Sequence, residues 1–211
     1  MVSSSKRIKT DELNQEKLSL IKRVFQNNGL IVMPTESIYG IACRMEPLAF
    51  EKLYSAKLRS YDKPLPVLIS SLDQLYDLAI EIPEIFYCLA DRFLPGPLTV
   101  ILKKNPKLNY ACFDQNSIAI RFSSHEITQK IAQSFGKPLL LSSANISGGP
   151  NLEKVDQIEL AVGDLVEAII DDGDLKQTIP STILSFVTDK PKILREGAIL
   201  RSDLDTIFKK L

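Results

Sequence analysis

Histidine and cysteine are scarce in this chain of 211 residues, which has one His and three Cys. The cysteines Cys43, Cys88 and Cys112 are widely spaced and odd in number, so they form neither a metal-type pair nor a disulfide framework. Proteins without disulfides are typical of a reducing cytosol. We therefore expect a cytoplasmic protein.

Long apolar segments and an excess of charge of one sign are also missing. No stretch approaches the roughly 20 apolar residues of a membrane span, and residues 1–15 lack the apolar centre of a secretory signal. Lys+Arg and Asp+Glu both number 26, which gives a formal net charge of zero. This balance counts against a protein whose main task is to hold nucleic acid electrostatically, although it leaves a local basic patch open.

Familiar catalytic signatures are absent as well. The chain has no G-x-x-x-x-G-K-[ST] phosphate loop, no G-x-G-x-x-G, no H-E-x-x-H and no G-x-S-x-G. The lone His125 is best interpreted as a helix cap or a solvated side chain rather than a general base. With so few acids, bases and nucleophiles, the residues favour a site that works by positioning and charge neutralisation, as in group transfer to or from phosphate.

Hydrophobic residues make up 45% of the chain, which is enough for the core of one domain. Periodicity predicts a helix capped by Thr10 and ending at Asn27–Gly29, and a short helix from Asp203. It predicts further helices at residues 46–59, 72–80, 83–93, 127–135 and 155–162. It predicts strands at residues 30–33, 66–70, 98–102, 117–122, 167–170, 182–186 and 192–194, and another strand that begins at residue 139.

Several of these strands are joined by loops too short for a helical crossover. The sequence therefore predicts an α/β fold with a twisted, mixed parallel and antiparallel sheet flanked by helices. We expect residues 1–9 to be disordered and residues 10–211 to form a single domain.

The most informative stretch is residues 139–149, Leu-Leu-Leu-Ser-Ser-Ala-Asn-Ile-Ser-Gly-Gly. An apolar run leads directly into small polar residues, which is how an α/β fold presents a polar site at the carboxyl end of a strand. Ser143 and Asn145 supply donors and acceptors, so we expect them on the floor of the site. A solvated strand-to-helix turn is the alternative.

Two clusters earlier in the chain have a similar design. Residues 34–40, Pro-Thr-Glu-Ser-Ile-Tyr-Gly, follow a strand and suit either a small ligand or a local turn. Lys57, Arg59 and Lys63 place three cations within seven residues, at a helix end and the following loop. They suit a nucleotide triphosphate, or simply the cation preference of a helix C-terminus. Lys57 and Arg59 reach one phosphate chain only if the helix ends there, since a continuing helix points them to different faces.

Two clusters later in the chain complete the set. Ser117, Ala119 and Arg121 share one face of a strand by its period of two. Arg121 needs a partner, either a substrate carboxylate or a structural acid. Ser181 lies in a Pro-Ser-Thr sequence, and Arg195 ends the last strand, where it meets phosphate or solvent.

These clusters, taken in order, resemble the YrdC-like family of threonylcarbamoyl-AMP synthases. The resemblance covers residues 30–197 and rests on eight landmarks, Pro34–Gly40, Lys57-x-Arg59, Lys63–Leu65, Leu94–Thr99, Ile118–Arg121, Ser143–Gly148, Pro180–Thr182 and Leu194–Gly197.

The resemblance implies a YrdC-like catalytic domain with a concave site and a nucleotidyltransferase activity. L-threonine, bicarbonate and ATP would give threonylcarbamoyl-AMP and pyrophosphate, for threonylcarbamoyladenosine modification of tRNA. It also implies site residues: Lys57, Arg59, Ser117, Asn145 and Arg195 for ATP, and Thr35, Arg121, Ser143 and Ser181 for threonine.

Lys57 and Arg59 would be the catalytic residues and would stabilise the departing pyrophosphate. Magnesium would be held by the ATP phosphates, with no protein side chain as a metal ligand. The partners implied are downstream tRNA-modification proteins. Direct tRNA binding would be weak, and no membrane is involved.

The chain departs from the family pattern in several places. The family often has Arg-x-Pro-x-His-Pro where this chain has Arg121-Phe-Ser-Ser-His-Glu126, so this turn loses two prolines. The Pro-Ser-Pro-Thr-like loop after Ser147–Gly148 is replaced by Gly149–Glu153, and no His lies near Leu68. Longer members carry a second carboxyl-terminal domain, which we do not expect in a chain of this length.

Two rival interpretations stay open. A non-enzymatic RNA-binding module would explain the basic clusters, although zero net charge counts against it. A carbamoyl-transfer domain of the hydrogenase-maturation type would have the same fold, but such domains sit in longer chains with zinc-type cysteine motifs.

Overall fold

An eleven-stranded mixed sheet runs through the computed structural model, which describes residues 6–175, 179–188 and 190–208. The strand order is β1-β9-β2-β3-β8-β4-β7-β6-β10-β11, with β5 paired to β6. The strands are β1 Lys6–Lys9, β2 Ile31–Met33, β3 Gly40–Arg44, β4 Val67–Leu68, β5 Ala79–Ile80, β6 Leu98–Lys104, β7 Ser117–Arg121, β8 Leu139–Ser143, β9 Ala168–Asp171, β10 Thr182–Ser185 and β11 Lys192–Arg195.

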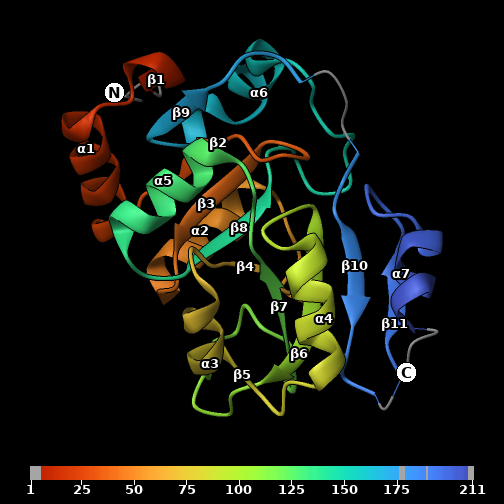
Figure 1. Ribbon diagram of the computed structural model, residues 1–211. Coiled ribbons are helices and arrows are strands. Elements are labelled where there is room, and N and C mark those ends of the chain that lie inside the picture. The colour runs from red at the N-terminus through yellow and green to blue at the C-terminus, as the bar shows by residue number, and fades with distance from the viewer. Residues whose placement is uncertain (1–5, 176–178, 189, 209–211) are drawn as a thin grey trace.

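The helices are α1 Gln15–Gln26, α2 Pro47–Ala56, α3 Leu75–Leu78, α4 Glu84–Phe93, α5 Glu126–Phe135, α6 Val155–Val162 and α7 Arg201–Phe208. Three short 3₁₀ turns, Thr10–Glu12, Leu72–Gln74 and Gly163–Leu165, complete the elements. The sheet is mixed as the sequence predicts, because β1, β9 and β2 pair in parallel whereas β2, β3, β8 and β4 are antiparallel. Figure 1 shows α1 and α5 beside the β1–β9 end, and α7 beside β11 at the other end.

Several element boundaries differ from the sequence prediction. The first long helix begins at Gln15, because the side chain of Asn14 rather than Thr10 accepts the capping bond from the Lys17 amide. The region 72–80 is divided into a 3₁₀ turn, α3 and β5, so it is not one helix. Strand β3 is missing from the sequence prediction, because it has only three consecutive apolar residues between Gly40 and Arg44 and no alternating pattern.

The expectation that residues 1–9 are disordered is wrong for Lys6–Lys9. These residues form β1, which pairs in parallel with β9. Ile8 is fully buried, and the Arg7 guanidinium bonds the Asp171 carboxylate at 2.9 Å. The strand is stable because one buried apolar side chain and the three ion pairs of Arg7, with Asp156, Glu159 and Asp171, come from a segment that looks almost uniformly polar. Residues 1–5 lie outside the described part of the chain.

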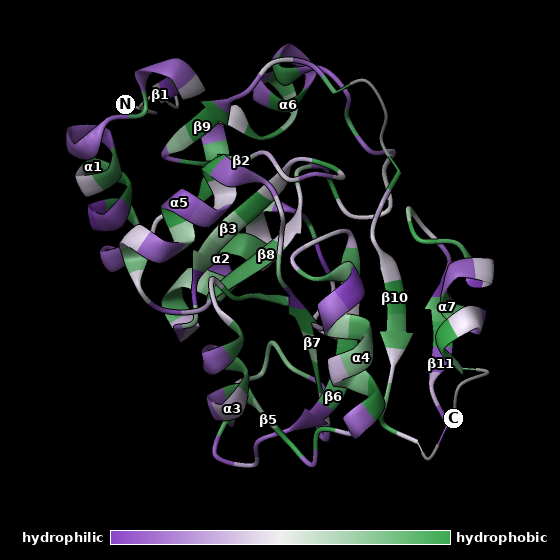
Figure 2. Cartoon of the chain, viewed as in Figure 1, coloured by the Kyte–Doolittle hydropathy of each residue, from purple (hydrophilic) through white to green (hydrophobic). Residues whose placement is uncertain are grey.

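The two faces of the sheet are covered to different extents. One face packs against α2, α4, α6 and α7 in the larger hydrophobic core. On the other face, α1 and α5 pack over β1, β9, β2, β3 and β8 in a second core. Figure 2 shows apolar strands at the centre and hydrophilic residues along the outer sides of α1 and α5.

The second face continues past these helices to form the floor of the site. Cross-strand register places Leu139, Leu68, Arg121, Thr99 and Ile183 in one row on adjacent strands. Leu139 and Leu68 lie in the core under the helices. The last three residues of the row line a cavity. The site therefore lies where the helical cover of this face ends.

Candidate active site

A cavity of about 340 Å³ lies over β7, β6 and β10. Seven of the nine residues named from the sequence line it, Thr35, Arg59, Ser117, Arg121, Ser143, Ser181 and Arg195. Apolar residues form the rest of the wall, among them Ile101, Phe113, Leu141 and Ile183. Three arginines and several hydroxyls within an apolar wall make a site suited to a small anionic ligand.

The loop between β2 and β3 supplies Thr35. Its Oγ1 donates to the Ile38 carbonyl at 2.6 Å and accepts from the amides of Ser37 and Ile38. Thr35 therefore closes a local turn and also lines the cavity. The turn interpretation of this motif is confirmed, and the ligand interpretation stays a prediction.

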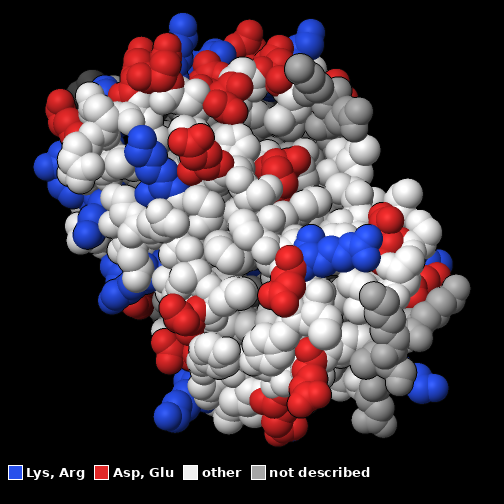
Figure 3. Space-filling model, in the orientation of Figure 1, with Lys and Arg blue, Asp and Glu red and all other residues white. Residues whose placement is uncertain are grey.

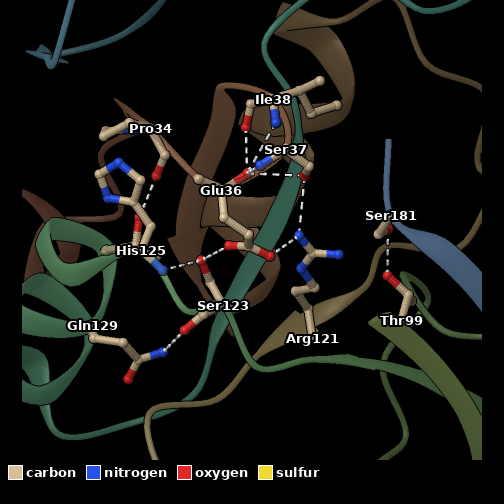
Figure 4. Close-up of polar contacts among 12 residues, drawn as sticks. Pro34, Glu36, Ser37, Ile38, Thr99, Arg121, Ser123, His125, Gln129 and Ser181 are labelled. Carbon is tan, nitrogen blue, oxygen red and sulfur yellow. Dashed lines mark hydrogen bonds and ion pairs between the residues drawn. The ribbon is translucent and has the colours of Figure 1, made fainter. Parts of the chain in front are cut away.

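Arg121, at the end of β7, is only 5% exposed. Its Nη2 donates to Glu36 Oε1 and, at 3.0 Å, to Ser37 Oγ. The second Glu36 oxygen accepts a hydrogen bond from Ser123 Oγ (Figure 4). Burial lowers the pKa of Arg121, an effect that the Glu36 carboxylate opposes and the Arg195 charge reinforces. A guanidinium nevertheless stays protonated in proteins.

The other terminal nitrogen of this guanidinium is unsatisfied. Arg121 Nη1 is buried and has no hydrogen-bond partner among the described residues. In Figure 4 the guanidinium lies between Glu36 on one side and the pair Ser181 and Thr99 on the other. A buried donor without a partner costs free energy, so this nitrogen is suited to donate a hydrogen bond to a ligand oxygen.

Ser181, Thr99 and Arg195 form a second polar group across the cavity. The hydroxyls of Ser181 and Thr99 are 2.8 Å apart. Arg195 donates to the Ser181 carbonyl through Nε at 3.1 Å and through Nη2 at 2.8 Å. Burial lowers the pKa of Arg195. These hydrogen bonds connect the start of β10 with the end of β11 at the edge of the cavity.

Helix α2 ends just before Lys57, as the phosphate hypothesis requires. The Arg59 amide bonds the Tyr54 carbonyl at 2.9 Å, and Leu58 has a left-handed φ of 49°. This backbone reversal separates the directions of Lys57 and Arg59. Arg59 turns toward the cavity and donates to the carbonyls of Lys63 and Pro64, at 3.0 and 2.9 Å.

Lys57 differs from its expected placement. Its side chain is 0% exposed and does not line the cavity. Its Nζ donates to the carbonyls of Ser143 and Asn145, and lies 3.2 Å from Asn145 Oδ1. Burial and the nearby Arg59 charge lower the pKa of Lys57 to about 7. In this arrangement the ammonium holds the loop after β8 instead of facing a ligand.

Asn145 belongs to the same buried group and does not line the main cavity. Its Oδ1 accepts from Ser143 Oγ at 2.6 Å, and its Nδ2 donates to the Gly149 carbonyl at 2.7 Å. Ser143 and Asn145 do lie at the end of β8 and next to Lys57, as expected. Ser143 alone of the two borders the main cavity.

Sequence reasoning missed the roles of Glu36 and Thr99. Glu36 stands within the quoted Pro34–Gly40 motif but was not assigned a partner. Thr99 pairs with Arg121 in the register of β6 and β7, which no local pattern reveals. His125 is the N-cap residue of α5, and its Nε2 lies 3.1 Å from Asp172 Oδ2. His125 therefore occupies the cap position of α5, but its side chain makes no capping hydrogen bond.

Charge is distributed without a dominant sign on the visible surface. Figure 3 shows Lys and Arg interspersed with Asp and Glu over that face. Within the described ranges, no group of three or more His, Cys, Asp or Glu side chains is arranged to hold a metal ion. Across the same residues, no helix combines the length and the apolar character needed to cross a membrane.

The fold and the cavity define a mixed α/β protein with a cavity on its sheet that is suited to a small anionic ligand. A family model of the Sua5/YciO/YrdC domain, described as telomere recombination, matches residues 23–197. The chain belongs to this family.

Individual relatives support the same family assignment. The chain is 30% identical to the threonylcarbamoyl-AMP synthase of Pyrococcus abyssi over 95% of its own length and 60% of that protein. It is 34% identical to a putative threonylcarbamoyl-AMP synthase of Methanocaldococcus jannaschii, over 92% of this chain and 94% of the relative. The P. abyssi Sua5 structure complexed with L-threonine superposes with a TM-score of 0.89 at 29% identity, covering 99% of this chain and 62% of that one. The chain thus spans about 60% of the P. abyssi relative.

Proposed function

We propose that this protein is an L-threonylcarbamoyladenylate synthase, a nucleotidyltransferase that converts L-threonine, bicarbonate and ATP into threonylcarbamoyl-AMP and pyrophosphate. Relatives named for this activity, and a related structure that holds L-threonine, support the assignment. The product would serve threonylcarbamoyladenosine modification of tRNA.

The observation that carries the proposal is the unsatisfied Nη1 of Arg121 beside the cavity. A threonine carboxylate bound there would supply the missing acceptor in a charge-assisted bond. Thr35, Ser143 and Ser181 line the same cavity and would contact the rest of the amino acid. An amino acid bound by its carboxylate keeps its amine free to react.

Arg59, Arg195 and Ser117 would bind the ATP phosphates, because they border the cavity and carry charge or a hydroxyl. Lys57 and Asn145 would contribute from behind the Ser143 loop, either by holding it or by moving toward the phosphates when ATP binds. Among the described residues no carboxylate lines the cavity, so magnesium would be bound through phosphate oxygens rather than by side chains.

The chemistry proceeds in two steps. Bicarbonate loses hydroxide to give carbon dioxide, and the threonine amine attacks this carbon dioxide and forms a C–N bond. The amine proton passes to the hydroxide to give water, which leaves the carbamate anion. A carbamate oxygen then attacks the α-phosphorus of ATP, the bond to the β-phosphate oxygen breaks, and pyrophosphate departs with the electron pair. The cations stabilise the charge that develops on pyrophosphate.

The carbamate is short-lived in water, so a closing segment would protect it. Residues 57–63 are our candidate, because they follow α2 and carry Arg59 at the cavity. The cytoplasmic location, the downstream tRNA-modification proteins and weak direct tRNA binding stay predictions from the sequence.

Mass spectrometry of a reaction with ATP, magnesium, L-threonine and bicarbonate tests the proposal. We expect threonylcarbamoyl-AMP, and pyrophosphate release that requires both threonine and bicarbonate. Omission of each substrate is the control. If no adenylate forms and the protein instead binds RNA with a steep salt dependence, the RNA-binding interpretation replaces this one.

A further inference from the structure

The guanidinium of Arg121 bonds two residues, Glu36 and Ser37, that do not belong to the expected substrate-binding set. Nη2 of Arg121 has two hydrogens, and its two acceptors are Glu36 Oε1 and Ser37 Oγ. Both donors of Nη2 are therefore used within the protein. The two donors of Nη1 have no partner in the described part of the chain.

Glu36 is itself held from the opposite side. Ser123 Oγ donates to Glu36 Oε2. Ser123 Oγ also accepts a hydrogen bond from the His125 amide at 3.2 Å. The Ser123 carbonyl accepts from Gln129 Nε2 at 2.7 Å. A continuous series of hydrogen bonds thus leads from the first turn of α5 through Ser123 and Glu36 to Arg121 (Figure 4).

We propose that Glu36 and Ser123 are positioning residues that fix the Arg121 guanidinium with Nη1 directed at the substrate carboxylate. This inference rests on the proposed function and adds to it the residues that orient the threonine-binding group. The side chains of Arg121 and Glu36 are 6% and 15% exposed, so water competes little for their bonds. An arginine with one nitrogen saturated loses less freedom when it binds a ligand, which raises affinity.

The same geometry has a simpler explanation, in which Glu36 only neutralises a buried charge. Ser123 separates the two explanations, because Ser123→Ala keeps both charges and removes one hydrogen bond to Glu36. If only charge matters, this variant binds threonine as the wild type does. If orientation matters, threonine affinity falls while ATP affinity does not.

The experiment measures the Kd values for L-threonine and for ATP separately by calorimetry. We expect Ser123→Ala to raise the threonine Kd about 3–10-fold, the range for one hydrogen bond, and to change the ATP Kd less than about twofold. The matched control is Ser185→Ala. Ser185 is likewise buried, and its Oγ accepts the Val187 amide at 3.4 Å near the far end of β10. It should change neither Kd.

A double-mutant cycle provides the second test. Glu36→Ala should weaken threonine binding more than Ser123→Ala, and Ser123→Ala should add nothing in the Glu36→Ala background, because Ser123 acts through Glu36. An unchanged threonine Kd in Ser123→Ala overturns the inference, as do equal losses for both ligands or additive effects in the cycle. If the wild type forms no threonylcarbamoyl-AMP and binds no threonine, the proposed function itself has failed, and the inference falls with it.

Discussion

Two buried cations flank the site, and their surroundings differ. Arg121 is 5% exposed and is paired with the Glu36 carboxylate. Lys57 is 0% exposed, and the acceptors around its ammonium are carbonyl and amide oxygens of Ser143 and Asn145. The described residues contain no ion pair to Lys57.

The number of donors on each group explains what each cation can do. A guanidinium has five N–H donors, so Arg121 bonds Glu36 and Ser37 and keeps Nη1 for a ligand. An ammonium has three donors, and the Ser143 loop offers at least that many acceptors to Lys57. The Lys57 carbonyl also accepts the Ser147 amide at 2.8 Å, so both ends of this residue bind the same loop. Arg121 is arranged for recognition, whereas Lys57 is arranged for support.

The largest effect is expected for Lys57→Ala, which removes the ammonium that supports the Ser143 loop. Turnover should fall roughly 10²–10³-fold, the scale for losing one charge-stabilising donor, with little change in threonine affinity. If Lys57 holds the loop, Tm should fall as well, since unpaired buried carbonyls cost about 1–3 kcal/mol each. Pyrophosphate release and thermal unfolding measure the two quantities, with exposed Lys52→Ala as the control.

Turnover near the wild-type rate would contradict a role of Lys57 in the chemistry, and an unchanged Tm would contradict its role in holding the loop. A slow enzyme with an unchanged Tm would instead favour direct contact with phosphate after the loop rearranges.

Arg121→Ala removes the guanidinium that we propose binds the threonine carboxylate. Threonine binding should weaken by about 1.5–3 kcal/mol, the range for a hydrogen bond to a charged group, and ATP binding should change far less. Calorimetry with each ligand tests this, and Arg92→Ala, on the exposed side of α4, serves as the control. Equal losses for threonine and ATP would argue against carboxylate binding by Arg121.

The dependence of folding stability on pH is a further way to distinguish Lys57 from Arg121. Burial lowers the pKa of Lys57 to about 7 from a usual value of 10.5. Between these values the unfolded chain binds more protons than the folded one, so the free energy of unfolding should rise with pH, by up to about 1.4 kcal/mol per unit. Denaturant unfolding between about pH 7 and 9 should give a flatter profile for Lys57→Met. Parallel profiles would show that Lys57 stays charged when buried.

The smallest effect concerns Leu58, whose φ of 49° directs Lys57 and Arg59 apart. The side chain is 78% exposed, so glycine removes little packing and relieves about 1 kcal/mol of left-handed strain. Leu58→Gly should raise Tm by about 2–4 °C in calorimetric scans. A lowered Tm would mean that the exposed leucine makes a stabilising contact after all.

Local patterns predicted most of the elements, because strands such as β8 and helices such as α4, α5 and α6 have strong periodicity and clear ends. Gly136, for example, ends α5 with a φ of 77°, as its position after the helix indicates. Two short strands were missed, because β5 has only two residues and β1 has a single apolar residue among three cations, so neither shows an apolar pattern. Their stability comes from pairing with β6 and β9, far away in the sequence.

The sequence by itself determined the mixed α/β class and the polar clusters that meet at one cavity, since these depend on composition, periodicity and motif order. Only the tertiary structure decided which cation faces that cavity. Lys57 and Arg59 are two residues apart and have similar chemistry, yet a left-handed turn at Leu58 sends one into the Ser143 loop and the other to the cavity. The partners of Arg121, likewise, lie 84 and 85 residues away in the chain, and only the folded structure brings the loop between β2 and β3 beside the end of β7.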